Sequence, residues 1–199
     1  NGEFSNLNSQ VSSSLARNKY LTRLILERNG MPNIPYLRPK SLEEAITFLE
    51  LHQKIIVKPL HGAGATDIHI VDTIEQLTAL NLPGKILEKY ILGKEIRYLV
   101  LNDSVIAVHE SKYGISVDQH RDLERVSYDV DTWDPVQTKM SLDISRVLDL
   151  PFAAVDYLID QEKNYYVLEV NSAPGFKWFH APSEGPPVDL AAMFLTASL

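Results

Sequence analysis

The chain has 199 residues, of which 45% are apolar and 23% are charged, and this content can bury a core as one compact unit or as two small lobes. Its formal net charge of -7 argues against a broad nucleic-acid-binding surface, because such surfaces neutralise phosphates with clustered Lys and Arg. It contains no cysteine, which excludes structural disulfides, Cys-ligated zinc and thiol catalysis.

No apolar run approaches the roughly 20 residues that a membrane-spanning helix needs, and the N-terminus lacks the basic-then-apolar pattern of a signal peptide. We therefore expect a soluble, cytoplasmic protein without a membrane partner. Residues 1–14 are rich in Asn, Ser and Gln, and Gly2-Glu3-Phe4 resembles a cloning remnant. We expect this segment to be disordered or foreign to the fold.

The first third of the chain predicts two helices. Residues 15–29 fit an amphipathic helix that ends at Gly30. Ser41 and Glu44 form a capping-box pattern, which predicts a second helix through Leu49.

A strand, a loop and a second strand follow. Residues 54–59 (KIIVKP) are rich in β-branched residues and lead into a glycine-containing loop over 61–66, after which residues 67–71 predict the second strand. A short helix is expected over 74–80.

Strand signals then accumulate at 85–90, 95–101 and 105–110. Asn102-Asp103 predicts a tight turn between the last two strands, so that they form a hairpin.

The C-terminal part begins with a polar, poorly periodic stretch at 113–134, which predicts a long loop with one short strand near 126–128. The remaining predicted elements are a helix that begins at Pro135, strands over 152–159 and 165–170, and a last helix after Pro187. This order describes an α+β chain whose two lobes would meet near 88–93.

Asp156, Glu169 and Asn171 are the first candidate site. Asp156 lies within one predicted strand, and Glu169 and Asn171 share a face of the strand that forms its hairpin partner. Two carboxylates and an amide across paired strands offer hard oxygen ligands that suit Mg²⁺. The alternative is that the acids are ordinary surface residues, but like charges directly opposite one another are destabilising unless a cation offsets them. The pattern therefore predicts a metal site.

Lys58 is a second candidate, because it ends an otherwise apolar strand shortly before the glycine loop. A lysine followed by mobile backbone N–H donors can hold the phosphates of a nucleotide. The loop matches neither the Walker nor the dinucleotide fingerprint, and lysines are also common at strand ends in solvent. Alone, this pattern leaves both interpretations open.

Several motifs follow one another in a characteristic order. They are Lys19, Lys58 before the glycine loop, Leu87-Glu88-Lys89-Tyr90-Ile91, Gly93-Lys94-Glu95-Ile96-Arg97, Asp156, and Glu169-Val170-Asn171-Ser172-Ala173-Pro174-Gly175. Together they resemble the ATP-grasp superfamily, and within it the glutamate-ligase (RimK-like) and glutathione-synthetase-like branch. The resemblance implies an α+β ATP-grasp domain over 15–199, in which a smaller lid lobe at about 36–90 and a larger C-terminal lobe at about 91–199 grip ATP between antiparallel sheets.

The resemblance also implies roles for individual residues. Phosphates would be held by Lys19, Lys58 and the lid loop of His61, Gly62, Ala63, Gly64, Ala65 and Thr66. The nucleoside would contact Glu88, the backbone at Lys89 and Tyr90, and, at the ribose, Glu95. Mg²⁺, with Mn²⁺ as the alternative ion, would be bound by Asp156, Glu169 and Asn171. An apolar slot for the purine would be formed by Leu87, Val57 and Leu168, unless these residues are plain core.

Arg97 and Lys112 are the candidates for contact with the reacting groups. Arg97 shares a strand face with Glu95 and would either contact a phosphate or pair with that acid. By resemblance, Lys112 lies where relatives keep a basic residue for the γ-phosphate and the acyl-phosphate. Arg121 and Arg125 are candidates for binding a substrate carboxylate, with surface ion pairs as the alternative.

The chain departs from the glutamate-ligase branch in its long loop. Relatives carry an arginine and an asparagine followed by paired glycines, whereas this chain has Gln119-His120-Arg121-Asp122-Leu123-Glu124-Arg125-Val126. Substrate identity is therefore open. Most ATP-grasp ligases also have a further N-terminal α/β domain, so the resemblance implies that such a domain or a homo-oligomer partner completes the site.

The function that the resemblance implies is ATP-dependent ligation of a small-molecule or peptide carboxylate to an amine through an acyl-phosphate. Such chemistry requires positioning and electrostatics rather than a covalent nucleophile. One alternative is a small-molecule kinase on the same fold, although the sequence identifies no general base for it. The other is a regulatory ATP-binding domain with little turnover, which would not need a complete set of metal ligands.

Overall fold

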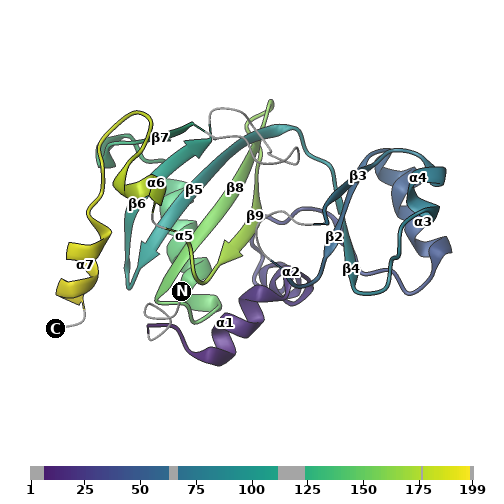
Figure 1. Ribbon diagram of the computed structural model, residues 1–199, viewed down its shortest axis with the longest axis horizontal. Coiled ribbons are helices and arrows are strands. Elements are labelled where there is room, and N and C mark those ends of the chain that lie inside the picture. Colours follow the sequence, from purple (N-terminus) through teal and green to yellow (C-terminus); the bar gives the residue numbers. More distant parts are fainter. Residues whose placement is uncertain (1–6, 63–66, 112–123, 176, 198–199) are drawn as a thin grey trace.

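The computed structural model describes residues 7–62, 67–111, 124–175 and 177–197, and it consists of two lobes that lie side by side (Figure 1). Each lobe is built on one sheet, and all strand pairs within the two sheets are antiparallel. The predicted α+β class with two antiparallel sheets is confirmed. None of the described helices is long and apolar enough to cross a bilayer.

The smaller lobe, called the lid lobe from here on, has a four-stranded sheet in the order β1-β4-β2-β3. Its elements are β1 (Tyr36–Leu37), α3 (Leu42–His52), β2 (Ile55–Pro59), β3 (His69–Val71), α4 (Ile74–Thr78) and β4 (Lys85–Lys89). The helices α3 and α4 cover one face of this sheet, where Leu49, Val57 and Leu87 belong to a buried core. Lys58 and Glu88 alternate with these core residues and therefore lie on the opposite face.

The larger lobe has a five-stranded sheet in the order β7-β6-β5-β8-β9. Its elements are β5 (Gly93–Leu101), β6 (Ser104–Ser111), β7 (Arg125–Ser127), the 3-10 helix η2 (Val130–Thr132), α5 (Pro135–Val147), β8 (Phe152–Asp160), β9 (Tyr165–Asn171), α6 (Lys177–His180) and α7 (Leu190–Ala197). The predicted turn is confirmed at Asn102, whose φ is 54°, and the predicted helix start is confirmed at Pro135.

The two faces of the larger sheet are covered differently. The helix α5 packs on one face, where Tyr98 and Tyr157 are part of the core. On the other face, Phe179 of α6 and Phe194 of α7 pack with Leu99. The part of this second face beyond that apolar cluster carries the polar side chains of the candidate site.

Two helices, α1 (Gln10–Arg17) and α2 (Lys19–Arg28), replace the single helix predicted over 15–29. The break lies at Asn18, whose backbone is extended and whose side-chain oxygen accepts a hydrogen bond from the N–H of Leu21 at 3.2 Å. This is the geometry by which asparagine caps a new helix rather than continuing the previous one. As a result α2 begins at Lys19.

The segment 1–14, expected to be disordered or foreign to the fold, is in part an ordered piece of the larger lobe. Asn8 is 4% exposed, and its side chain bonds the backbone N–H and C=O of Phe152 and the C=O of Ser172. Ser9 then caps α1. The expectation was wrong for residues 8–14, because one asparagine that pairs with backbone groups leaves no periodic apolar signal; residues 1–6 lie outside the described part.

The capping box predicted at Ser41 is only half formed. Ser41 accepts a hydrogen bond from the N–H of Glu44, but the Glu44 carboxylate accepts one from the N–H of Lys40 at 2.7 Å instead of from Ser41. A complete capping box occurs at α4, between Thr73 and Gln76. The helix predicted after Ser41 is nevertheless present as α3.

Candidate functional site

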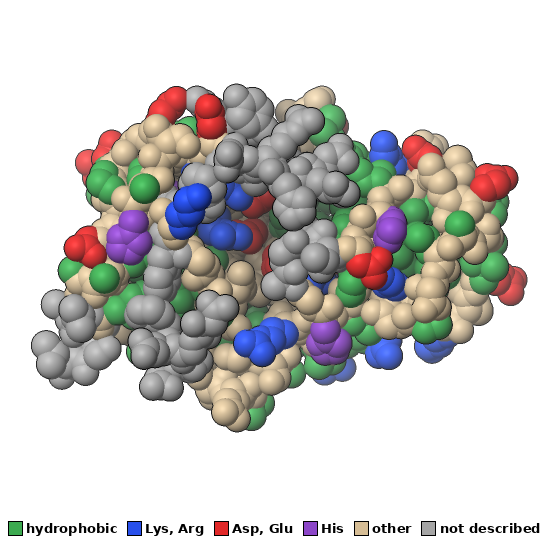
Figure 2. Space-filling view, in the orientation of Figure 1, with side chains coloured by type: hydrophobic (Ala, Val, Ile, Leu, Met, Phe, Trp, Pro, Cys, Tyr) green, Lys and Arg blue, Asp and Glu red, His purple; other side chains and the backbone are tan. Residues whose placement is uncertain are grey.

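A row of polar side chains crosses the second face of the larger sheet. Strand register pairs Ser127 with His109, His109 with Arg97, Arg97 with Asp156 and Asp156 with Glu169. Residues directly opposite one another share a sheet face, so all five side chains lie on the same side. Figure 2 shows basic and acidic side chains gathered near the middle of this side of the molecule. The expected pairing of Asp156 with Glu169 across two strands is present.

Arg97 and Asp156 form a two-point ion pair at the centre of the row. The Nε and Nη2 atoms of Arg97 donate to the two carboxylate oxygens of Asp156 at 2.6 and 2.7 Å. Burial lowers the pKa of Arg97, but the Asp156 carboxylate outweighs this effect and raises that pKa above its usual value. Pairing with Glu95 had been one of the two expectations for Arg97. The acid that it contacts is the one directly opposite on β8.

Glu95 has a different cationic neighbour, Arg125 of β7. The Nη1 atom of Arg125 lies 3.4 Å from Oε1 of Glu95, and both side chains are largely buried. Burial raises the pKa of Glu95, and the charge of Asp156 raises it further. Arg125 therefore extends the charged row toward β7.

The strand β9 carries a bulge directly before Glu169. Asp156 pairs with Glu169 while Tyr157 pairs with Val167, so Leu168 is an extra residue in β9. A bulge changes the direction of the side chains that follow it. Here the extra residue brings Glu169 onto the face of Asp156.

Lys19 approaches Glu169 from the start of α2. Its Nζ lies 3.9 Å from Oε1 of Glu169 and donates to the backbone C=O of Gly62, in the lid lobe, at 2.9 Å. Asn171, opposite Ala154, lies on the same sheet face, and its side-chain oxygen accepts the N–H of Ala173 at 2.9 Å. The predicted metal ligands are thus brought to one face of the β8–β9 pair, with a cation beside them.

The lid lobe contributes a buried charged cluster made of Lys58, Glu88 and Arg23. Lys58 Nζ is 2.7 Å from Oε2 of Glu88, and Arg23 Nε donates to Oε1 of the same carboxylate at 3.0 Å. Burial raises the pKa of Glu88, but the charges of Arg23 and Lys58 outweigh it and lower that pKa from 4.5 to about 2. Burial lowers the pKa of Lys58, and Glu88 offsets this only in part.

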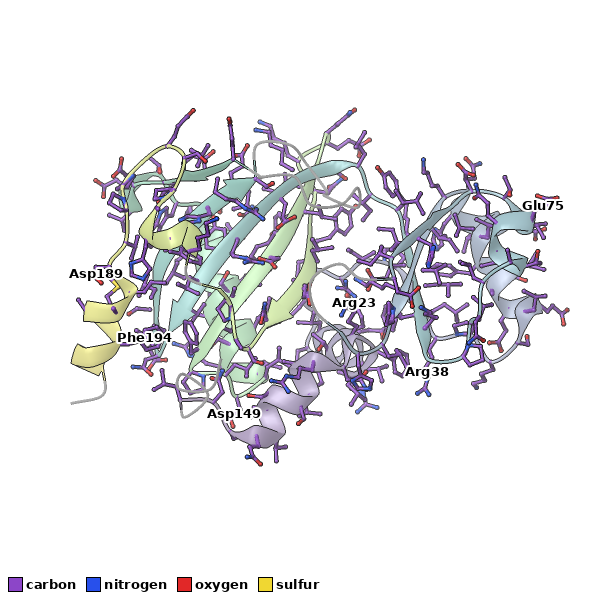
Figure 3. The ribbon with its side chains drawn as sticks, viewed as in Figure 1. Arg23, Arg38, Glu75, Asp149, Asp189 and Phe194 are labelled. Carbon is purple, nitrogen blue, oxygen red and sulfur yellow. The ribbon has the colours of Figure 1, made fainter. Side chains whose placement is uncertain are left out.

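Arg23 is the residue that the sequence analysis missed. It is 3% exposed and lies between the larger sheet and the lid sheet (Figure 3). The available signal was its spacing, since Lys19 and Arg23 are four residues apart and therefore share a face of α2. An arginine in an amphipathic helix usually faces solvent, so that signal was weak.

Of the three residues proposed for the purine slot, only Leu168 lies outside the core of the lid lobe. Val57 and Leu87 are fully buried against α3 and α4, on the face of the lid sheet away from Lys58. They are core residues, which was the alternative weighed for them, because alternation along a strand shows which residues share a face but not which face meets a ligand. Leu168 packs with Ile34 and Ile91 at the junction of the lobes.

The backbone donors expected to contact adenine have partners within the protein. The N–H of Lys89 donates to the C=O of Pro35 at 2.9 Å, and that of Tyr90 donates to the C=O of Lys54 at 3.0 Å. The carbonyl oxygens therefore remain the backbone groups of this linker that are suited to a purine amine.

The glycine loop is described only at its start. His61 and Gly62 are exposed, and the imidazole Nε2 of His61 lies 3.4 Å from Nδ2 of Asn18. The predicted site residues outside the described part of the chain are Ala63, Gly64, Ala65, Thr66 and Lys112, and Arg121 lies outside it too.

Three buried polar side chains at the β6–β7 end of the row have no hydrogen-bond partner at one atom. Among the described residues these are Nε2 of His109 and the hydroxyls of Ser111 and Ser127, which are 2%, 1% and 4% exposed. The His109 ring stacks on Phe179, with 4.1 Å between centroids. Burial, together with the charges of Arg125 and Arg97, lowers the pKa of His109 to about 4.

The donor set at the β8–β9 end fits a hard divalent cation. Within the described residues no group of three or more His, Asp or Glu side chains could share a metal, so the candidates are two carboxylates and one amide. Each oxygen of Asp156 accepts one bond from Arg97 and keeps further lone-pair capacity, because a carboxylate oxygen can accept two. Mg²⁺ accepts such a small set when phosphates and water supply its other ligands.

Comparison with known proteins places the chain in a family. The model of the RimK-like ATP-grasp domain matches residues 16–195. The tetrahydromethanopterin:alpha-L-glutamate ligase of Methanocaldococcus jannaschii is 28% identical over 81% of this chain and 60% of its own length. The D-alanine–D-alanine ligase of Pseudoalteromonas translucida is 27% identical over 87% of this chain and 63% of its own length.

Solved structures show the same fold. The ATP-grasp ligase PsnB, complexed with a minimal precursor, superposes with a TM-score of 0.76 at 20% identity, covering 96% of this chain and 61% of PsnB. The chain thus spans about three fifths of the length of the relatives that it matches (60% and 63%). Since the family model matches nearly all of it, the chain belongs to the RimK-like ATP-grasp family.

Proposed function

We propose that this chain binds ATP with Mg²⁺ between its two lobes and uses it to join a carboxylate to an amine. The observation that carries the proposal is the row of polar side chains across the larger sheet. Its Asp156–Glu169 end faces Lys58 of the lid lobe. Asp156 and Glu169 lie opposite each other, Lys19 of α2 lies 3.9 Å from Glu169, and the charge of Glu169 also acts on Lys58 of the lid lobe. Two adjacent anionic groups flanked by cationic groups suit a metal-bound triphosphate.

Each part of the nucleotide has a candidate contact. The phosphates would be held by Lys19, Lys58 and the loop that begins at His61 and Gly62. The Glu88 carboxylate and the carbonyl oxygens of Lys89 and Tyr90 would accept hydrogen bonds from the purine amine, and Glu95 would accept them from the ribose hydroxyls. Leu168 would supply apolar contact with the base. The family membership supports this placement.

Asp156, Glu169 and Asn171 would hold Mg²⁺, which when bound supplies charge neutralisation to the phosphates. Arg97 would orient Asp156 through its two hydrogen bonds. It retains guanidinium N–H donors beyond the two that Asp156 accepts, since arginine has five, and these would contact the transferred phosphoryl group. Lys112 is the second candidate for that contact.

In the proposed reaction an oxygen of the substrate carboxylate attacks the γ-phosphorus of ATP, and ADP leaves. The amine nitrogen then attacks the acyl carbon, phosphate leaves, and the amine loses a proton. The residues of the chain bind, orient and shield these groups from water, because the acyl-phosphate would otherwise hydrolyse. No covalent protein intermediate is required.

The substrate class is proposed from relatives as a small molecule or a peptide. The two curated relatives named above act on a glutamate and on D-alanine by their names. PsnB was solved with a precursor peptide, and in another state with Mg and ADP. An aqueous reaction compartment such as the cytoplasm, and a further domain or subunit that completes the acceptor site, belong to the same proposal.

The test is calorimetric titration of ATP, with and without Mg²⁺, on the wild type and on the double variant Glu169→Gln, Asn171→Ala. Glu50→Gln is the control, because Glu50 is an exposed acid on α3. We expect Mg²⁺-dependent binding that the double variant loses and the control keeps. Wild-type binding that is indifferent to Mg²⁺ and to the double variant would contradict the proposed site.

Product analysis separates ligation from other uses of ATP. Over a panel of amino-acid and peptide pairs, ligation yields ADP, phosphate and an amide in equal amounts. A kinase would yield ADP and a phosphoester, and a regulatory domain would bind ATP without any product. Either of the last two results would overturn the ligase proposal while leaving the nucleotide site intact.

A further inference from the structure

Arg23 contacts both lobes from a position that solvent does not reach. Toward the lid lobe, its Nε donates to Glu88. Toward the larger lobe, Nη1 donates to the C=O of Val167, and Nη2 donates to the C=O of Leu168 at 2.7 Å. Nη1 also donates to Asn33 at 2.9 Å, in the segment that follows α2. Four of the five guanidinium donors are therefore used, toward three separate parts of the chain.

The two carbonyl groups that Arg23 contacts belong to the bulge of β9. Leu168 is the extra residue there, and no β8 residue is its register partner. An extra residue leaves backbone groups without ladder partners, and the guanidinium satisfies one of them. The next residue is Glu169, whose direction depends on this bulge. Arg23 thereby supports the backbone that orients a proposed metal ligand.

A second bond pattern holds Arg23 itself in place. The side-chain amide of Asn33 donates back to the C=O of Arg23 at 2.8 Å, and Asn33 bridges to Val167. The N–H of Val167 in turn donates to the C=O of Pro32 at 3.2 Å. The segment after α2, the helix and the bulge are thus connected to one another as well as to Glu88.

Lys19 and Arg23 lie one above the other on α2 and span the same gap in different ways. Lys19 joins Gly62 of the lid lobe to Glu169 of the larger lobe. Its ammonium is a flexible point charge that a phosphate can recruit, whereas the planar guanidinium of Arg23 is engaged on several sides. The Lys19 contact suits a ligand, and the Arg23 contact suits a permanent connection between the lobes.

We propose that Arg23 is a positioning residue that ties Glu88 to the β9 bulge and so sets the spacing between the two halves of the nucleotide site. The inference rests on the proposed function for the site itself. It assigns no contact with nucleotide to Arg23, which acts through Glu88 and Lys58 on one side and through Glu169 on the other.

The first test is amide hydrogen exchange on the full chain, without ligand, for the wild type, Arg23→Lys and the control Arg28→Gln. Arg28 is an exposed arginine in the same helix. A lysine keeps the charge beside Glu88 but cannot supply the planar set of donors. We expect faster exchange in Arg23→Lys at β4 and at β9 together, with β5 and β6 unchanged. Exchange that stays at the wild-type rate, or that rises equally in all strands, would overturn the proposal.

The second test measures ATP affinity by calorimetry in the presence of Mg²⁺. Loss of charge-assisted hydrogen bonds at Glu88 and at the bulge predicts binding weakened at least about tenfold in Arg23→Lys, with Arg28→Gln at the wild-type value. Asn33→Ala removes a single support of Arg23 and should shift both readouts in the same direction by less. This second variant keeps the proposal testable if Arg23→Lys does not fold.

The two proposals fail in different ways. If the wild type does not bind ATP, the proposed function fails, yet the exchange comparison still tests whether Arg23 couples β4 to β9. If the wild type binds ATP and Arg23→Lys binds it equally well with local exchange unchanged, the role of Arg23 fails and the proposed function stands.

Discussion

Two buried polar clusters among the described residues differ in the hydrogen-bond partners of their groups. In the cluster between the lobes, each oxygen of Glu88 faces a cation and Arg23 uses four of its donors, although Oε2 of Glu88 meets Lys58 as an ion pair without hydrogen-bond geometry. At the β6–β7 end of the sheet, His109, Ser111 and Ser127 each bury an atom that has no partner among the described residues. A satisfied network orders the parts that it joins, whereas an unsatisfied one costs stability unless water or a ligand completes it.

This difference suggests different roles for the two clusters in the proposed site. The cluster between the lobes is already arranged before any ligand arrives, so it contributes preorganisation. The β6–β7 cluster lies along the same sheet face, beyond Arg97 from the proposed metal ligands. Predictions that change one cluster and leave the other intact can therefore test the distinction.

The largest expected effect comes from Glu88→Ala. This substitution leaves Arg23 and Lys58 as uncompensated charges in the interior, and breaking a buried pair in this way costs about 3–5 kcal/mol. Urea denaturation should show this loss, while Glu75→Ala, on the outer side of the same lobe (Figure 3), should stay within about 0.5 kcal/mol. A loss below about 1 kcal/mol for Glu88→Ala would show that solvent reaches the cluster.

The Glu88 carboxylate should also account for much of the stability that is lost at low pH. Its pKa is lowered from 4.5 to about 2 in the folded chain, so its contribution is complete above pH 4.5 and is lost as the pH falls from there toward 2. The lowering corresponds to about 3 kcal/mol. Stability measured from pH 5 to 2 should fall more steeply in the wild type than in Glu88→Gln. Parallel curves would contradict the buried ion pairs.

The sequence was sufficient to predict the elements whose signals are local. Alternating strands, the turn at Asn102 and the helix start at Pro135 each depend on a few neighbouring residues. The break at Asn18 and the bulge at Leu168 depend instead on what the surrounding strands and helices require. Alternation along β2 and β4 places Val57 and Leu87 on one face but does not say which face the helices cover, so the choice between purine slot and plain core stayed open in the sequence.

The candidate site was predictable where spacing alone brings residues together. Asp156 and Glu169 lie on the two strands of one hairpin, so their nearness could be anticipated, but their direct pairing depends on the bulge at Leu168. The bonds of Arg23 to Glu88 and to Leu168 join residues 65 and 145 positions apart. Periodicity in the sequence does not indicate contacts at that separation. The partner of Arg97 likewise depends on the pairing of β5 with β8, which are distant in the sequence.

In the β6–β7 cluster, stability should depend on pH in a higher range than the range given for Glu88. Burial and two neighbouring arginines lower the pKa of His109 from 6.5 to about 4. The unfolded chain therefore binds a proton that the folded chain does not, so stability is lost as the pH falls from about 6.5 toward 4. Allowing for partial solvent screening, we expect about 2 kcal/mol.

The check is thermal denaturation of His109→Leu and of the control His61→Gln across that window. His109→Leu should flatten the slope between pH 6.5 and 4, because the titrating group is gone, and His61→Gln should keep it, since His61 is exposed. If the slope persists in His109→Leu, another group carries it and the imidazole is not held neutral by its surroundings.

The smallest effect is expected for Ser127→Ala, and it bears most directly on the comparison. A buried hydroxyl without a partner contributes its desolvation cost and no hydrogen bond, so its removal should leave stability unchanged or raise it by about 0.5 kcal/mol. Ser145→Ala is the matched control, because Ser145 is equally buried and donates to the C=O of Leu150 at 2.6 Å. It should lose about 1 kcal/mol in the same urea titration. A loss for Ser127→Ala as large as that for Ser145→Ala would mean that ordered water already completes the β6–β7 cluster. The two clusters would then differ in what satisfies them rather than in whether they are satisfied.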